Sequence, residues 1–236
     1  MPKLSNTLAI RIVIAASAMC LGSSALSEDS LSHHQDYEAA LNITLNSEER
    51  ITTQMSRLLI GEVKHFDFLQ FEHIELMRHA RALAHPPSDV SEEAKEEIKR
   101  EADALMSASL EIEWIIADFL QEYAQVRSAT SNILDIVSSL EDEKDAALRS
   151  KLHSIKAQTQ QLVLNGYQDD WEELNNSLSR VLASDIGAQA KAELDFQKAQ
   201  LAHYLPTLAK HIKRVENGAS DEIAKRLEQA YRSKAT

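Results

Sequence analysis

Apolar residues recur at helical spacing along most of the chain from residue 46 onward, and this pattern predicts a protein built from long helices. Residues three, four and seven positions apart lie on one face of a helix, so a regular apolar stripe marks the face that packs against other helices. No alternating Val, Ile or Thr run bounded by turn residues occurs. The expected fold is all-α: an antiparallel up-down-up-down four-helix bundle with long helices, a short C-terminal helix and an N-terminal arm.

The first long helix is expected over residues 47–84. Asn46-Ser-Glu-Glu49 has the spacing of a capping box, in which the first residue accepts a bond from the first turn and the Glu reaches back. Pro86 and Pro87 end this helix, because proline lacks an amide donor and disfavours a helical conformation before it.

The next stretch, 89–165, contains no Gly or Pro after Asp89 and is long enough for two helices. The turn between them is expected near 127–132, a cluster of Ser, Thr and Asn residues, and the acidic stretch 141–145 is the competing position. The second of these helices carries a near-heptad apolar stripe, as in coiled coils. Its end is expected at Asn165, before Gly166.

A fourth helix is expected from about 170 to 216, with a kink at Pro206, because proline removes one backbone hydrogen bond and clashes with the preceding turn. Its core face is expected to include Phe196. Asn217-Gly218 should end it, and a last amphipathic helix should run from Ser220 to about 233.

The first long helix has two apolar faces when its residues are placed at about 100° per residue. The broad face, expected to meet the core, comprises Ile51, Met55, Leu58, Leu59, Glu62, Phe66, Leu69, His73, Leu76, Met77 and Ala80. Two of its members, Glu62 and His73, are polar. A second set, formed by Ile60, Phe68, Phe71 and Ile74, lies largely outside this face. Such a helix needs a second partner.

The first 25 residues have the pattern of a secretory signal peptide. Lys3 and Arg11 precede an apolar run at 12–21, and small residues at 23–25 fit a cleavage site. The run is about half the length that spans a bilayer, so we expect no membrane span after cleavage and a periplasmic location. The expected organisation is a signal peptide over 1–25, a polar arm over 26–45 and a single helical-bundle domain over 46–236.

Cysteine content and charge narrow the possible chemistry. Cys20 is the only cysteine and is expected to leave with the signal peptide, so disulfides, thiolate metal sites and covalent haem attachment are not expected. The chain has 37 acidic against 25 basic residues, a net charge of −12. This acidic balance argues against nucleic acid and is compatible with cations or basic partners.

The candidate metal ligands are Glu62, His65, His73 and Met77. Glu62-x-x-His65 has the spacing used by di-iron carboxylate bundles, but the second such motif that a dinuclear site needs is absent from the sequence. A single copper, iron or haem held by His65 or His73, with Met77 or a Glu, is the simpler site. The alternative is that no cofactor binds and that His73 is a core histidine with a protein partner.

No nucleophile elbow, phosphate loop or His-Glu-x-x-His motif occurs, and the chain has only five Gly, so an enzyme is not expected. The first hypothesis is an exported protein-interaction, adaptor or sensor-type module. Its apolar set, Ile60, Phe68, Phe71 and Ile74, would be covered by the arm, the last helix, a protein partner or a second copy. The alternative is a metal- or haem-binding bundle with its site near Glu62, His65 and His73.

Overall fold

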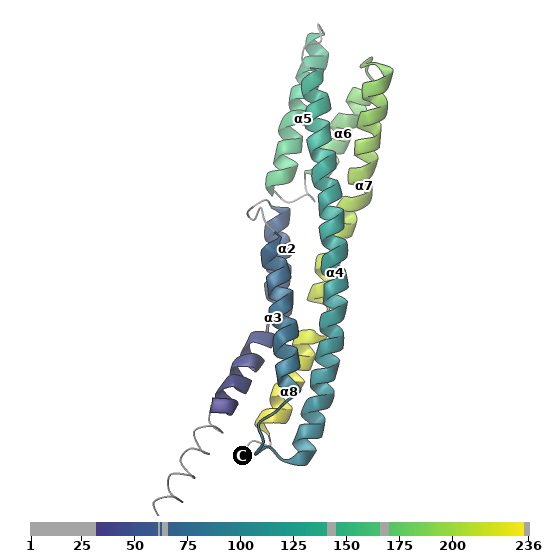
Figure 1. Cartoon of the computed structure of the whole chain (residues 1–236). Helices are drawn as coiled ribbons and strands as arrows, with labels where there is room; N and C mark the ends of the chain where they lie inside the picture. Colours follow the sequence, from purple (N-terminus) through teal and green to yellow (C-terminus); the bar gives the residue numbers. More distant parts are fainter. Residues whose placement is uncertain (1–31, 61, 63–65, 141–144, 166–169, 234–236) are drawn as a thin grey trace, which may run out of the picture. The chain divides into compact units, whose positions relative to one another are not determined.

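The computed structural model describes residues 32–60, 62, 66–140, 145–165 and 170–233. The helices in chain order are α2 (Ser47–Leu59), α3 (Asp67–Leu83), α4 (Glu92–Ser139), α5 (Ala146–Asn165), α6 (Trp171–Leu182), α7 (Ala188–Glu216) and α8 (Ser220–Arg232) (Figure 1). Residues 32–44 form a further helix ahead of α2. Within these described ranges no strand occurs, so the predicted fold class, all-α, is confirmed.

The single helix expected over 47–84 is wrong, because the chain forms two helices, α2 and α3, with a break between them. α2 ends at Leu59, and Ile60 is its C-cap residue. In the sequence Gly61 follows this residue, and glycine is favoured just past the end of a helix and disfavoured inside one. Gly61 itself lies outside the described residues.

The turn expected near 127–132 is also wrong, because α4 runs through it as one helix of 48 residues (Figure 1). The hydroxyl of Thr130 donates to the carbonyls of Val126 and Arg127, at 3.1 and 2.9 Å. A hydroxyl satisfied in this way inside a helix does not end the helix. α4 ends at Ser139 and α5 begins at Ala146, so the break between these helices coincides with the competing position, 141–145. Residues 141–144 lie outside the described residues.

The fourth expected helix is divided between α6 and α7. The break ends at Gly187, whose φ of 81° is a conformation that residues with a Cβ rarely adopt. Phe196, expected in the core, has 59% of its surface exposed. The end of α7 at Glu216 and the position of α8 agree with the sequence prediction, and Pro206 lies inside α7.

One compact unit consists of Met1–Leu45, Arg78–Met106 and Glu222–Thr236. The hydroxyl of Tyr37 donates to the carbonyl of Leu83 at 3.0 Å, and the Tyr37 ring lies 4.7 Å from that of Tyr231. The ring of His34 bonds the hydroxyl of Tyr231 and, at 2.9 Å, the carboxylate of Asp89. The described part of the predicted polar arm is therefore a helix anchored by aromatic and polar contacts.

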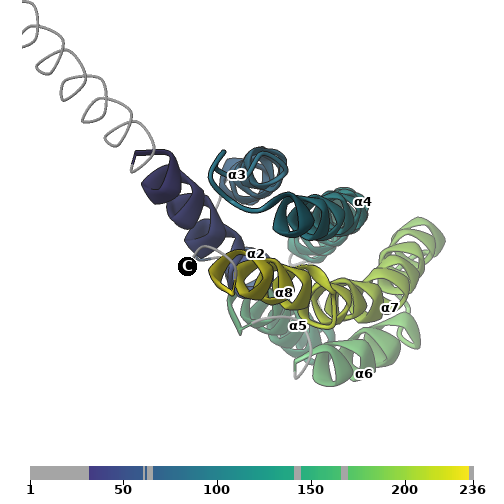
Figure 2. The same cartoon turned by 90° about the horizontal axis from the view of Figure 1, so that it is seen from below.

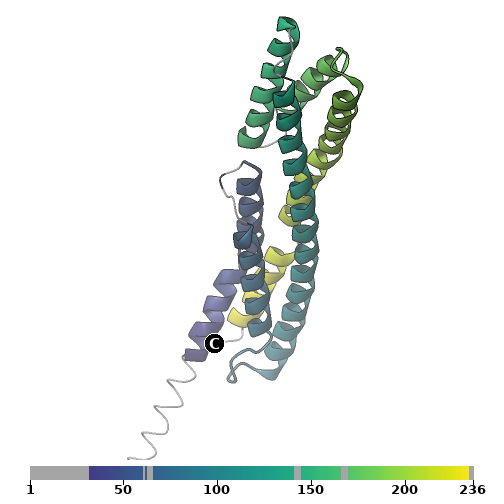
Figure 3. The same ribbon diagram turned by 45° about the horizontal axis from the view of Figure 1, so that its top comes forward.

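The other unit consists of Asn46–Met77 and Ser107–Asp221. In it α6 packs against both α5 and α7, and α2 packs against α7 (Figure 3). The hydroxyl of Tyr123 donates to the carbonyl of Leu58 at 2.9 Å, close to the end of α2. The fully buried side chains include Met55, Leu58, Leu69, Leu76, Phe119, Ile133, Leu152, Leu178, Leu201 and Val215.

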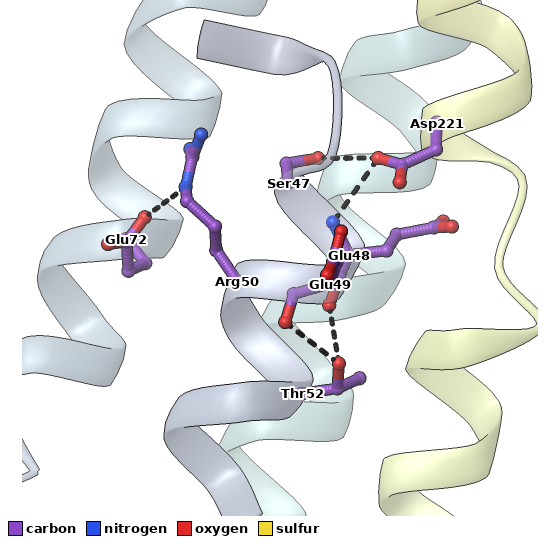
Figure 4. Close-up of polar contacts among 7 residues, drawn as sticks. All are labelled: Ser47, Glu48, Glu49, Arg50, Thr52, Glu72 and Asp221. Carbon is purple, nitrogen blue, oxygen red and sulfur yellow. Dashed lines mark hydrogen bonds and ion pairs between the residues drawn. The ribbon is translucent and has the colours of Figure 1, made fainter.

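In this second unit the starts of α2 and α8 cap each other. A carboxylate oxygen of Asp221 accepts from the backbone amide of Glu48 and from the hydroxyl of Ser47, both at 3.2 Å (Figure 4). In return, Glu48 Oε1 accepts from the amide and hydroxyl of Ser220, at 2.8 and 2.7 Å. The first amides of a helix have no acceptor within it and carry partial positive charge, so each carboxylate stabilises the other helix's start.

The local capping box predicted at Asn46 is not formed. Asn46 has a φ of 65° and its side chain makes no capping hydrogen bond. The acceptor for the first turn of α2 comes instead from Asp221, 173 positions along the chain from Glu48.

The carboxylate of Glu48 is almost completely buried, with 6% of the residue exposed. Burial raises the pKa of this carboxyl above its usual value, the hydrogen bonds from Ser220 oppose that rise, and the charge of Asp221 adds to it. Gly218 makes room for the carboxylate, because a Cβ at residue 218 would lie 2.3 Å from Glu48 Oε1 and 2.9 Å from the carbonyl oxygen of Val215.

Replacing Glu48 tests this capping. Glu48→Ala removes the acceptor for two buried donors of Ser220, and we expect it to lower the free energy of unfolding by roughly 1–3 kcal/mol. Glu48→Gln keeps an acceptor and removes the charge. A carboxyl whose pKa is higher in the folded than in the unfolded protein destabilises progressively as pH rises from the unfolded pKa, about 4.3, through the folded pKa.

We therefore expect Glu48→Gln to gain stability relative to wild type as pH rises from 4 to 7, measured by urea denaturation. Glu49→Gln is the matched control, because Glu49 is exposed in the same turn. Wild-type and Glu48→Gln stabilities that run parallel across this pH range would contradict the raised pKa.

Candidate functional site

Glu62, one of the predicted metal ligands, has a protein partner in the structure. Glu62 was expected to face the core, but it is exposed, and its carboxylate pairs with Arg57 Nε at 3.2 Å. The inward orientation is wrong because α2 ends before Glu62, so this residue does not continue the helical face of Met55 and Leu58.

The other candidates have separate environments. His73 is half-buried, and its Nε2 lies 3.2 Å from the carbonyl oxygen of Ser109 on α4, so Nε2 carries the proton and donates. Met77 is half-buried, and His65 lies outside the described residues. Among the described residues, no three or more His, Cys, Asp and Glu side chains gather as a metal site would require.

A polar cluster that the sequence did not predict lies between α4 and α7. Glu122 accepts hydrogen bonds from the hydroxyl of Thr207 and, at 3.1 Å, from Nε2 of His211. His211 is buried, and its Nδ1 has no partner in the structure. Because the carboxylate of Glu122 can only accept, Nε2 of His211 carries a proton and donates it.

The second apolar set of the sequence is exposed. Phe68, Phe71 and Ile74 on α3 have 58%, 58% and 59% of their surfaces exposed, whereas Leu69 on the same helix is fully buried. Ile60, at the end of α2, is half-buried. The prediction that these three α3 residues lie off the core face is therefore confirmed.

α4 adds two exposed side chains that the sequence analysis missed, Leu110 at 45% and Trp114 at 71%. They lie four residues apart, on the side of α4 opposite the buried Ile112. The wheel of α4 carried this signal, because both residues fall outside the stripe that includes Ile112 and Ile116.

The exposed residues of α3 and α4 belong to neighbouring surfaces. α3 lies beside α4 (Figure 2), and the hydrogen bond from His73 to Ser109 joins them. Ile74 and Leu110 each follow one partner of this bond in the sequence, so both lie close to the contact between α3 and α4. We call Phe68, Phe71, Ile74, Leu110 and Trp114 the α3–α4 apolar patch.

The charged residues within the two helix segments that carry the α3–α4 apolar patch are all acidic. Residues 66–77 and 107–118, which contain the patch, include no Lys or Arg. They include Asp67, Glu72, Glu75, Glu111, Glu113 and Asp118. Two of these carboxylates have basic partners: Glu72 accepts from Arg50 Nε at 2.9 Å (Figure 4), and Glu111 lies 3.8 Å from Arg214. The patch is thus an apolar surface with an acidic surround.

Comparison with models of protein families, with curated proteins and with solved structures finds no match to this chain. Over the described residues, none of the helices combines the length and apolar character that crossing a membrane requires.

Replacing His73 separates its structural role from a metal-binding role. Because His73 donates to a carbonyl of α4, we expect His73→Ala to lower the free energy of unfolding by about 0.5–1.5 kcal/mol. Thermal unfolding with and without added copper, zinc or iron gives the readout. A metal-dependent rise in the melting temperature of the wild type that is lost in His73→Ala would make His73 a ligand.

Proposed function

We propose that this chain is an exported, non-enzymatic protein-interaction module of the adaptor, chaperone or sensor type. It binds an apolar segment with basic flanks, belonging to another protein, on the α3–α4 apolar patch. The observation that carries the proposal is the exposure of five large apolar side chains on two neighbouring helices. Contiguous apolar surface rimmed by polar residues is typical of interaction sites.

The residue types in the patch suit binding by a few strong contacts. Trp and the other aromatic residues are enriched at protein interfaces, where their burial contributes most of the binding free energy. We expect Trp114 and Phe71 to contribute most to the binding free energy, because each can transfer a large apolar area out of water.

The acidic surround selects the partner. In a symmetric dimer through this patch, the carboxylates of two copies would face one another, and like charges across an interface cost free energy. Lys or Arg residues beside the partner's apolar side chains would pair with Glu113 and Asp118 instead. An amphipathic helix with basic flanks combines these features, and a helix docking its apolar face on such a surface is a recurring recognition mode.

Export and bundle topology are parts of the same proposal. The signal peptide over 1–25 would place the protein in the periplasm, where its partner must then be found. An antiparallel four-helix bundle is supported by the packing of α6 against α5 and α7. Such a bundle would present α3 and α4 as a fixed surface. The metal- or haem-binding alternative near Glu62, His65 and His73 stays a prediction.

The test uses Trp114 as the reporter. The chain has two Trp residues, and Trp171→Phe leaves Trp114 as the one fluorophore of this type. A synthetic amphipathic helix of Leu and Lys is titrated into the purified exported protein. We expect saturable binding with a blue shift of Trp114 emission, and weaker binding at high salt because the rim contacts are electrostatic.

Phe71→Ser is expected to weaken binding of this peptide at least about tenfold, or 1.4 kcal/mol. Phe196→Ser is the matched control, because Phe196 is equally exposed but lies on α7. Equal binding of a Leu/Glu helix would contradict the charge argument. A stable dimer in solution that Phe71→Glu dissociates would replace the proposed partner by a second copy.

A further inference from the structure

The turn between α7 and α8 contains the sequence Asn217-Gly218, and Asn217 is the C-cap residue of α7. Both residues are exposed, and with Ala219 they line an open groove of about 640 Å³ beside α4 and the end of α7. Water therefore reaches this turn. An asparagine followed by glycine is the pair most prone to spontaneous deamidation, because glycine has no Cβ to hinder its own backbone nitrogen.

Deamidation of this pair is an intramolecular reaction followed by hydrolysis. The backbone nitrogen of Gly218 attacks Cγ of Asn217, the N–Cγ bond forms, and the Cγ–Nδ2 bond breaks. The side-chain amide leaves as ammonia and takes the proton of the attacking nitrogen. Water then opens the resulting succinimide at either carbonyl. The product is aspartate or isoaspartate, and in isoaspartate the backbone runs through Cγ and is longer by a methylene group.

The two reacting atoms are held apart in the closed turn. Nδ2 of Asn217 donates to the carbonyl of Lys213 at 2.7 Å, which directs the side chain back along α7. The N–H of Gly218 donates to the carbonyl of Val215 at 2.9 Å. The ψ of Asn217 is 16°, so the nitrogen of Gly218 is nearly eclipsed with the backbone nitrogen of Asn217 rather than with Cβ. Attack on Cγ therefore requires a large rotation about ψ.

That rotation opens the capping contact between α2 and α8, because the residues after Asn217 move with it. Ser220 donates to Glu48 Oε1 through its amide and its hydroxyl, at 2.8 and 2.7 Å. Gly218 is packed against the same carboxylate, since a Cβ there would lie 2.3 Å from Oε1. Glu48 is buried, so separating it from these donors costs free energy. The reactive conformation is therefore confined to a locally opened state of the turn.

We propose that Asn217 is a deamidation site whose rate is set by the opening of the α2–α8 capping contact. The site is separate from the proposed interaction surface, because none of its residues belongs to the α3–α4 apolar patch. Isoaspartate lengthens the chain between Val215 and Ser220, so the two hydrogen bonds to Glu48 do not re-form in their original geometry. A transient opening of this turn is thereby converted into a permanent loss of capping.

The test follows the deamidation of residue 217 in the purified exported protein at mildly alkaline pH, by peptide mapping and mass spectrometry. We expect the reaction to be at least about tenfold slower in the folded protein than in the same protein unfolded in urea. Glu48→Ala should raise the rate in the folded protein at least about fivefold. Glu48→Gln keeps an acceptor for Ser220 and should stay close to wild type. Glu49→Gln, exposed in the same turn of α2, is the matched control.

Asn165-Gly166 is the same pair elsewhere in the chain and serves as the internal reference. Its rate should be equal in wild type and Glu48→Ala. Ser220→Ala removes the hydroxyl donor alone, and it should give an intermediate rise at residue 217 even where Glu48→Ala fails to fold by circular dichroism. Asn217→Gln should abolish the signal.

Three results would overturn the inference. The first is an equal rate at residue 217 in the folded and the urea-unfolded protein, which would show no protection by the turn. The second is a rate that neither Glu48→Ala nor Ser220→Ala changes. The third is an equal acceleration at Asn165 and Asn217, which would assign the rate to global unfolding instead of this turn.

Discussion

The mutual capping of α2 and α8 is the constraint from which much of the second unit follows. Glu48 and Asp221 each place a carboxylate at the start of the other helix, so neither helix can shift along its axis without exposing amides that lack acceptors. With its start fixed, α2 lies against α7 and directs Ile51, Met55 and Leu58 into the core. The same contact holds the α7–α8 turn at one end of the groove.

The features that depend on neighbouring residues in the chain could be predicted from the sequence. The all-α class, the start of α8 at Ser220 and the end of α5 at Asn165 depend on neighbouring residues and were predicted correctly. Two helix breaks were not predicted, because the regular apolar spacing continues past each break and indicates an unbroken helix. One glycine in each segment, Gly61 and Gly187, was the sequence feature that pointed to the break. The capping of α2 was missed for a different reason: its acceptor, Asp221, is far away in the sequence, and no local pattern identifies such a partner.

The residues of the candidate site divide in the same way between those that a local pattern predicts and those that require tertiary structure. Phe68, Phe71 and Ile74 were placed off the core face because the helical wheel of one segment suffices for that inference. Leu110 and Trp114 complete the surface only because α3 and α4 are neighbours, which requires tertiary structure. The inward orientation of Glu62 depended on an unbroken helix, so it failed when α2 ended at Leu59. His73 has the protein partner that the cofactor-free alternative anticipated.

The close approach at Gly218 has a consequence for how this sequence can diverge. A methyl group at residue 218 and a full-length carboxylate at residue 48 occupy the same space. The two positions are therefore coupled: a chain that gains a side chain at 218 must shorten or redirect the one at 48, and it must also move the carbonyl of Val215, which lies 2.9 Å from the same methyl position. A descendant that keeps Glu48 should therefore also keep Gly218, a dependence that links the first turn of α2 to the turn that precedes α8.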